Sequence, residues 1–388
     1  MLKNLIENTA SPWTMGDGTD SDVVLCTRIR LARNFAQYPF PLKQTETSGQ
    51  AVLADLSAFC KDRNDLHFYD LHDVSPLEKR ALVEKHYISP EHSKDDNHYR
   101  GLAVNDTGSV SIMINEEDHL RIQCFAPGLD LDDLWQNVNA LDDDIESYFD
   151  YAFDERLGYL TCCPSNLGNG MRASVMMHLP GLTLTKRLGL LDQLSNFGMT
   201  VRGLFGEGSQ SVGDLYQISN QSAIGQNEKD ILTNLKSVTQ QIIKEERNAR
   251  NFLKEQNGLR LSDRIWRAYG TLSNARYMSS REALELISLV RLGYHLGYFT
   301  QLESAQVDQL YLMAQPGYLQ VLYGHDMDEA ARDVYRAEKL RTTIGLRCRG
   351  RRSRRPVCMK IYRKRENCNE TKRGWMLCLV ILRKKRSV

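Results

Sequence analysis

Alternating apolar and polar positions predict a series of short β-strands in the first 220 residues. Residues 23–31 read Val-Val-Leu-Cys-Thr-Arg-Ile-Arg-Leu, and the strand period of two places Arg28 and Arg30 on the same face. Neighbouring segments between residues 100 and 126 are close enough in sequence to pair as antiparallel strands. The pattern predicts strands at 100–105, 109–115, 119–126, 200–205 and 214–220, a short apolar segment at 172–179, and helices at 47–60, 76–86, 131–153 and 184–197.

From Glu228 onward the apolar spacing is helical throughout. A long amphipathic helix is expected over 228–256, because Asn257-Gly258 is a typical helix stop. Shorter helices are expected at 261–275, 281–296, 303–313 and 327–340. We therefore predict an α/β (α+β) domain over residues 1–255, with an antiparallel sheet and flanking helices, followed by an all-helical domain over 256–341.

The last part of the chain differs sharply in composition from the rest. Residues 341–388 hold 17 Lys and Arg against two Asp and Glu, a net charge of +15, whereas the preceding residues carry a net charge of −14. This tail also holds four of the nine cysteines and has no helical or alternating period. One interpretation of 342–388 is a disordered arm that binds nucleic acid. The interpretation we favour is an aberrant stretch, such as an out-of-frame translation.

Composition otherwise indicates an ordinary globular protein, with 41% hydrophobic and 26% charged residues. Residues 1–18 lack the apolar core of a secretory signal, and the apolar run 375–382 is too short to cross a bilayer. The cysteines show no C-x-x-C pair and no histidines at zinc-finger spacing. A cytoplasmic protein with reduced thiols, no membrane segment and no structural metal is the resulting expectation.

The segment Asn115-Glu-Glu-Asp-His-Leu-Arg121 places three carboxylates, an imidazole and a guanidinium in seven residues. It follows the strand pattern of residues 109–114, so a rigid edge carries the acidic cluster. Repulsion between neighbouring carboxylates raises their pKa values unless cations lie close by, and such crowding is typical of sites where chemistry uses it. The alternative is a solvated acidic turn.

Phosphate-binding glycine loops are missing from this sequence. It contains neither G-x-x-x-x-G-K-[ST] nor a glycine loop followed by H-R-D. A nucleotide would have to be held by side chains, and arginine suits this because its planar fork matches phosphate oxygens. Taken singly, each candidate is better explained as a surface ion-pair partner. The candidates are Arg28, Arg30, Arg121, Arg172 and Arg202.

Two further residues are candidates for a role in catalysis. Glu207 stands between Gly206 and Gly208, which permit unusual backbone angles and the close approach of a ligand. Cys163 precedes Pro-Ser-Asn-Leu-Gly, where a thiolate near arginines would have a low pKa. The alternatives are a plain turn and a buried, inert cysteine.

Together these motifs resemble the guanidino (phosphagen) kinase family, whose order and spacing they follow over residues 20–225. The branch most similar is the bacterial one that phosphorylates arginine in proteins, because Arg332-Asp333-Val-Tyr-Arg336-Ala resembles its R-D-x-x-R-A motif. Asn169 departs from the family, which commonly has threonine there. The tail also has no family counterpart.

The resemblance implies a set of functional residues. The nucleotide-binding set is Thr27, Arg28, Arg30, His86, Arg121, Arg172, Ala173, Ser174 and Arg202, the five arginines being the ligands of the ATP phosphates. The catalytic set is Glu117, Glu207 and Cys163, and Arg332, Asp333 and Arg336 would form a phosphoarginine-sensing site. No residue is assigned to a metal.

On this interpretation the reaction uses ATP with Mg²⁺, Glu117 is the general base and Glu207 orients the acceptor guanidinium. Family members acting on small guanidino compounds have a helical domain before the Arg-x-Arg strand, whereas only about 26 residues precede it here. We therefore expect an open cleft and an arginine displayed on a protein. The acidic body would attract such basic partners.

The resemblance further implies a stress-response role and several partners. Phosphoarginine would direct proteins to the Clp unfoldase–protease, a heat-shock repressor would be one target, an activator protein is expected, and the helical domain would form a homodimer. The alternatives are a kinase of free arginine or another small guanidino compound, and a catalytically retired module that binds nucleic acid or protein through the basic tail.

Overall fold

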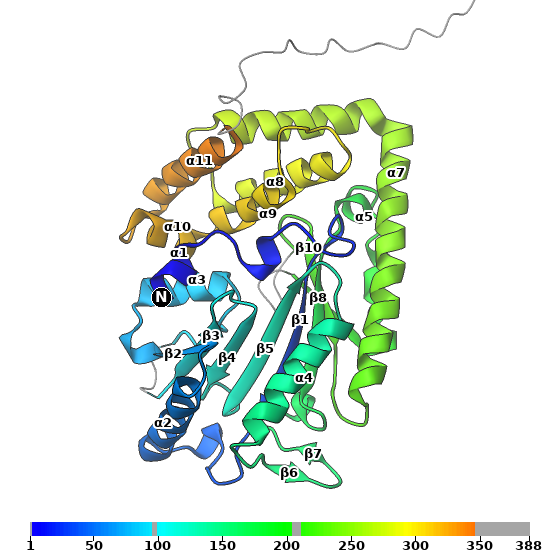
Figure 1. Ribbon diagram of the computed structural model, residues 1–388. Helices are drawn as coiled ribbons and strands as arrows, with labels where there is room; N and C mark the ends of the chain where they lie inside the picture. Colours follow the sequence, from blue (N-terminus) through cyan, green and yellow to red (C-terminus); the bar gives the residue numbers. More distant parts are fainter. Residues whose placement is uncertain (1, 95–98, 204–210, 346–388) are drawn as a thin grey trace, which may run out of the picture. The chain divides into compact units, whose positions relative to one another are not determined.

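The computed structural model describes residues 2–94, 99–203 and 211–345. Its centre is an eight-stranded sheet in the order β2-β3-β4-β5-β1-β8-β10-β9, in which all neighbours are antiparallel (Figure 1). The strands are β1 (Val24–Arg33), β2 (Leu66–Asp70), β3 (Gly101–Asn105), β4 (Val110–Ile114), β5 (Leu120–Pro127), β8 (Met171–His178), β9 (Met199–Gly203) and β10 (Leu215–Asn220), and β6 (Phe153–Asp154) pairs with β7 (Gly158–Tyr159) in a separate hairpin.

The helices of the first half flank the sheet, and those of the second half pack on one another. They are α1 (Leu2–Glu7), α2 (Glu46–Lys61), α3 (Pro76–Glu84), α4 (Asp132–Glu146), α5 (Pro180–Leu184), α6 (Gly189–Asp192), α7 (Glu228–Asn274), α8 (Ser280–His295), α9 (Ser304–Met313), α10 (Pro316–Tyr323) and α11 (Glu329–Gly345). Among the described residues, no helix is both long enough and apolar enough to cross a bilayer.

Side-chain alternation gives the sheet two different faces. One face is apolar: Ile29, Leu31 and Ile122 are fully buried there and form the core together with residues of α2, α4 and α7. Burial of this face removes apolar surface from water, which is the main stabilising contribution to such a fold. The opposite face carries Arg28 and Arg30 at the intervening positions of β1.

Two apolar clusters cover the ends of the opposite face and leave its middle to the arginines. Leu82 and Tyr87, from α3 and the turn after it, pack with β3 and β4 together with α1. At the other end, Cys26, Met176 and Leu215 join the core of the helical second half. The polar middle of this face is therefore bounded by packed elements on both sides.

The predicted fold class is confirmed: a mostly antiparallel sheet with flanking helices precedes a helical second half. The stop expected at Asn257 is a kink, since this residue alone leaves helical angles (φ −134°, ψ 28°) while the helix continues to Asn274. The helix predicted over 131–153 ends at Glu146, and the chain beyond it is extended: Tyr151 bridges to Phe35, and Phe153 pairs with Tyr159 in the β6–β7 hairpin.

Four other elements differ from the sequence prediction. The helix expected over 184–197 is broken into α5, α6 and a short 3-10 helix, and Lys186 between the first two has a positive φ of 58°. Strand β2 and helices α1 and α10 were not predicted. Each is short, so its apolar residues do not repeat often enough to establish a period.

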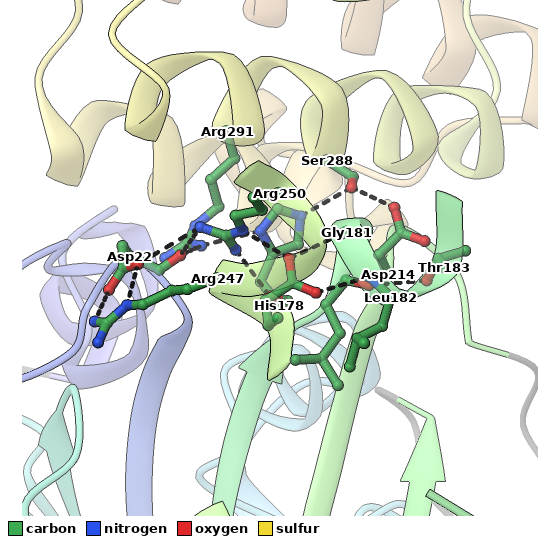
Figure 2. A network of polar contacts seen from close by, with 12 residues as sticks. Asp22, His178, Gly181, Leu182, Thr183, Asp214, Arg247, Arg250, Ser288 and Arg291 are labelled. Atoms are coloured by element: carbon green, nitrogen blue, oxygen red, sulfur yellow. Dashed lines mark hydrogen bonds and ion pairs between the residues drawn. The ribbon is translucent and has the colours of Figure 1, made fainter. Parts of the chain in front are cut away.

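A buried polar network joins the helical second half to the sheet (Figure 2). Arg291 of α8 pairs with Asp308 (Nε to Oδ1, 2.6 Å) and donates from Nη1 to His178 Nδ1 at 3.1 Å. His178 Nε2 then donates to Ser288 Oγ (2.8 Å), whose hydroxyl donates to Asp214 Oδ2 (2.5 Å). This direction of donation requires a neutral imidazole, and burial together with Arg291 lowers the pKa of His178 well below its usual value.

The neighbouring helix α7 adds a second buried ion pair to the same junction. Arg250 donates to Glu246 Oε1 (2.6 Å) and to the carbonyls of Asp22 and His178. Glu246 in turn accepts the first backbone N–H groups of α5, from Gly181 (2.8 Å) and Leu182 (2.9 Å). The helices are thus attached to the ends of β1 and β8 by hydrogen-bonded charges.

Replacing Arg291 with methionine is expected to lower the free energy of unfolding by about 3–5 kcal/mol, because the buried carboxylate of Asp308 loses its cation. Chemical denaturation measures this. The double variant Arg291→Met/Asp308→Asn should recover part of the loss, since no uncompensated charge remains. A single variant that unfolds at the wild-type denaturant concentration would contradict the assignment.

His119, from the acidic segment, has a structural role. Its Nδ1 accepts the N–H of Phe35 (3.1 Å), its Nε2 donates to the carbonyl of Pro39 (3.0 Å), and its ring stacks on Phe35. Burial lowers the pKa of His119 to about 4. The imidazole is therefore neutral in the folded protein and connects the end of β1 to β5.

This histidine predicts a loss of stability in acid. Below its ordinary pKa of about 6.5 the unfolded chain binds a proton at His119, whereas the folded chain does so only near pH 4, so the free energy of unfolding falls as the pH falls through this window. Through this window His119 lowers the free energy of unfolding by about 3 kcal/mol. Denaturation of His119→Gln between pH 7 and 4 should show a shallower decline than the wild type, and parallel declines would refute this.

Candidate functional site

A cleft of about 730 Å³ lies over the polar face of the sheet. We call it the arginine cleft, because Arg30, Arg121, Arg172 and Arg202 line it. Glu116, Glu117, Arg100, Cys163, Ser165 and Asn166 are among its other lining residues. A cavity of about 160 Å³ adjoins it, sharing Arg30, Arg121 and Arg202 and adding Arg28, His86, Gln123 and Gln217.

Strand pairing sets the positions of the arginines. Directly opposed residues of antiparallel strands lie on the same face, and Arg30 of β1 stands opposite Arg172 of β8. Arg202 of β9 stands opposite Gln217 of β10, which accepts from Arg28 Nη2 at 3.1 Å. Backbone hydrogen bonds across five strands therefore hold the guanidinium groups, and no glycine loop is needed.

Mutual repulsion is the main electrostatic feature of the arginine cleft. Burial lowers the pKa of Arg30 well below its usual value, and the four neighbouring arginines lower it further. Its Nε is buried and has no hydrogen-bond partner among the residues that the structure describes. The pKa of Arg28 is also lowered, to about 10, chiefly by burial. A polyanion such as a nucleotide phosphate chain would relieve both the repulsion and the missing hydrogen bond, so the residues present fit ATP.

His86 stands at the inner end of the site. It has a positive φ of 63°, which turns its side chain from the end of α3 into the adjoining cavity. Its ring packs edge-on against Trp13 at 5.3 Å between centroids. Burial, Arg28 and Arg30 lower the pKa of His86 to about 3, so its imidazole is neutral beside the cationic groups.

The adjacent carboxylates Glu116 and Glu117 have different environments. Burial alone would raise the pKa of Glu116, but Arg121 (2.8 Å) and the hydroxyl of Ser89 (2.6 Å) outweigh it and lower this pKa. Glu117 is more exposed and pairs with Arg121 at 3.1 Å, yet burial and its acidic neighbours raise its pKa. Glu116 thus holds Arg121, whereas Glu117 is suited to accept a proton.

The loop carrying Cys163 is fixed against this acidic turn. Asp118 Oδ1 accepts the backbone N–H of Cys162 at 2.7 Å and Asn34 Nδ2 at 2.7 Å. Cys163 Sγ lies 3.0 Å from Ser165 Oγ, and its thiol also hydrogen bonds toward Glu117, which opposes part of the rise in the pKa of that carboxylate. Thiol and carboxylate are therefore neighbours in the lining of the cleft.

Not every residue predicted for the nucleotide site faces the cleft. Strand alternation turns Thr27 and Ala173 to the opposite face; the Thr27 hydroxyl is buried and donates to the carbonyl of Gly128 at 2.7 Å. Ser174 lies at the narrow inner end, where its hydroxyl donates to the carbonyl of Arg28 at 3.3 Å. Glu207 lies outside the described residues.

The predicted phosphoarginine-sensing residues form a separate cluster on α11. Arg336 is buried, pairs with Asp333 and donates to the carbonyls of Met278 (2.9 Å) and Ala314 (2.8 Å). Arg332 is half-buried and donates to the carbonyl of Met327 at 2.9 Å. None of the three lines the arginine cleft.

Sequence reasoning missed several polar residues of the site. Gln123 and Gln217 share the face of the arginines by the same period of two, a signal that was available. Ser89 and Asp118 had no such signal, since their roles depend on contacts with Glu116 and Cys162. Across the described ranges, no group of three or more His, Cys, Asp or Glu side chains is placed to hold a metal ion.

Family comparisons match most of the chain. The model for the ATP:guanido phosphotransferase C-terminal catalytic domain matches residues 48–249, and that for the protein-arginine kinase McsB C-terminal domain matches residues 258–354. Among solved structures, taurocyamine kinase from Schistosoma mansoni is similar with a TM-score of 0.55 and 26% identity, over 62% of this chain and 35% of that one. Lombricine kinase shares the fold at a TM-score of 0.54 and 24% identity, over 63% and 75% of the two chains.

Curated relatives align over nearly their whole length. The protein-arginine kinase of Halothermothrix orenii is 44% identical over 348 residues, which cover 89% of this chain and 99% of the relative. That of Caldanaerobacter subterraneus is 47% identical over 332 residues, 84% and 98% of the two chains. By these matches and by the architecture of its site, the chain belongs to the protein-arginine kinases of the ATP:guanido phosphotransferase family.

Proposed function

We propose that this chain transfers the γ-phosphoryl group of ATP to the guanidinium group of arginine side chains in proteins. The observation that carries the proposal is the placement of Glu117 at the wall of a cleft lined by repelling arginines. Such a cleft binds a triphosphate, and a carboxylate with a raised pKa beside it receives the proton of the attacking group.

In the proposed step, one terminal nitrogen of the substrate guanidinium attacks the γ-phosphorus in line with the leaving oxygen. The N–P bond forms, the bond from phosphorus to the β,γ-bridging oxygen breaks, and the ADP oxygen keeps the electron pair. The proton of the attacking nitrogen passes to Glu117. Arg30, Arg121 and Arg172 hold the phosphate oxygens, so the protein supplies placement and charge neutralisation.

Glu207 and Cys163 complete the proposed site. We infer from the family motif that Glu207 orients the acceptor guanidinium, and that Cys163 contacts it beside Glu117. Mg²⁺ accompanies ATP in this proposal and would neutralise part of its charge. We assign no protein ligand to it.

The acceptor is an arginine displayed on a protein, as the names of the curated relatives state for those enzymes. We propose residues 1–255 as the catalytic domain and 256–341 as a helical domain that senses phosphoarginine through Arg332, Asp333 and Arg336 and forms a homodimer. The kink at Asn257 and the family matches ending at 249 and starting at 258 support this division. An activator protein, a heat-shock repressor and the Clp unfoldase–protease in the cytoplasm are its proposed partners.

Replacing Glu117 with glutamine should reduce kcat by about a hundredfold or more, because the proton acceptor is lost. ATP affinity, measured by equilibrium titration with a fluorescent ATP analogue, should change little, since the arginines remain. Glu155→Gln, an exposed carboxylate-to-amide change on the β6–β7 turn, is the matched control. Wild-type turnover in Glu117→Gln would rule out the assigned role.

The acceptor class is tested by comparing an arginine-rich protein with free arginine in the presence of ATP. We expect acid-labile phosphate, the mark of an N–P bond, on the protein and far less on free arginine. The same protein with its arginines replaced by lysines is the control and should remain unmodified. Equal or faster turnover of free arginine would favour the small-guanidine alternative.

A further inference from the structure

Helix α10 of the helical region begins without a cap of its own. Its N-cap residue Gln315 makes no side-chain hydrogen bond to the first turn, and Pro316 has no N–H. The next two backbone N–H groups, of Gly317 and Tyr318, both donate to the carboxylate of Glu84, at 2.7 and 2.6 Å. A residue at the end of α3 thus caps a helix more than 230 positions away in sequence.

The contact between Glu84 and the start of α10 leaves no room for a side chain at Gly317. A Cβ at Gly317 would lie 3.0 Å from both oxygens of Glu84 and from Cβ of Arg80, so glycine allows the approach. A carboxylate is also the favoured partner for the positive end of a helix dipole. Both oxygens of Glu84 are therefore engaged by α10, and the end of α3 is held to it.

The two residues after Glu84 are held by different elements. Lys85 Nζ donates to the carbonyls of Leu5 (2.6 Å), Ile6 (3.2 Å) and Asn8 (2.5 Å) at the end of α1. His86 follows with its positive φ and lines the inner cavity of the nucleotide site. Figure 1 shows α1, α3 and α10 meeting at this point, where each contacts the other two.

Beyond His86, the chain is attached directly to the arginine face. Gln123 Nε2 of β5 donates to the carbonyl of His86 at 2.9 Å. Three residues later the hydroxyl of Ser89 donates to Glu116 Oε1 (2.6 Å), the carboxylate that holds Arg121. The segment 84–89 therefore contacts the N-terminus of α10 at one end and Glu116, the partner of Arg121, at the other.

We propose that Glu84 is a positioning residue for the nucleotide: by capping α10 it sets the place of the α3 end, and so of His86 in the adjoining cavity and of Ser89 in the arginine cleft. The inference rests on the proposed binding of ATP in that cleft. It makes the helical region a determinant of ATP affinity, although that region contributes no residue to the cleft itself.

Steady-state kinetics with ATP and a protein acceptor tests this in the full chain. Glu84→Gln keeps one acceptor oxygen but sets an NH₂ group against a backbone N–H, so a charged hydrogen bond is lost. We expect KM for ATP to rise about tenfold or more, with KM for the protein acceptor unchanged and kcat within about threefold. Gly317→Ala, which presses on the same contact from α10, should raise KM for ATP in the same direction.

Two controls separate positioning from general destabilisation. Glu78→Gln makes the same chemical change at the start of α3, and Tyr318→Phe removes the bond from α10 to the carbonyl of Glu7 (2.9 Å) while leaving Glu84 in place. Both should keep the wild-type KM for ATP. If Glu84→Gln lowers only the melting temperature, or lowers kcat and both affinities together, the inference is wrong.

The variant His86→Ala distinguishes failure of this inference from failure of the proposed function. If His86→Ala raises KM for ATP and Glu84→Gln does not, the nucleotide site stands and Glu84 has no positioning role. If neither variant changes KM for ATP, the placement of the nucleotide beside His86 is itself incorrect, and this inference falls with it.

Discussion

Repulsion among guanidinium groups on one face of a sheet is the constraint around which this structure is built. Arg30 lies among four other arginines, and its pKa is lowered by all of them in addition to burial. Such a group of charges does not assemble by itself. It persists because pairing between β9, β10, β8, β1 and β5 sets the spacing, while the opposite face of the same strands is buried under α2, α4 and α7. The stabilisation gained on one face offsets the electrostatic cost on the other.

That cost has a chemical use, because the groups that relieve it are anions. Glu116 relieves part of it within the protein by pairing with Arg121, and a bound phosphate chain would relieve the rest. Glu117 is the next residue; its pKa is raised, and it contacts the thiol of Cys163. Two identical side chains in succession thus take different roles, which their surroundings decide.

The helical second half is joined to the sheet by hydrogen-bonded charges as well as by apolar packing. Arg291 and Arg250, each paired with a carboxylate, bind the backbone just before β1, and Arg250 also binds the end of β8 (Figure 2). These ends of the strands lie away from the candidate catalytic residues. Glu84 makes a similar charged attachment between the end of α3 and the start of α10. Such contacts have strict geometry, so they transmit position more faithfully than an apolar surface, which tolerates sliding.

The sequence alone determined which residues share a face and which family the chain resembles. Period-two alternation identified Arg28 and Arg30, and the predicted strand boundaries agree closely with the structure. The long helices predicted over 131–153, 184–197 and 228–256 agree less well, because contacts with distant segments decide where a helix ends. Only the tertiary structure decided that the Thr27 hydroxyl binds the carbonyl of Gly128, that Lys186 interrupts a helix, and that α10 exists and begins on Glu84. The physical reason is the distance along the chain over which each property is decided. Alternation and helix periodicity are local, whereas burial, ion pairing and the pKa of a carboxylate depend on residues that only folding brings together.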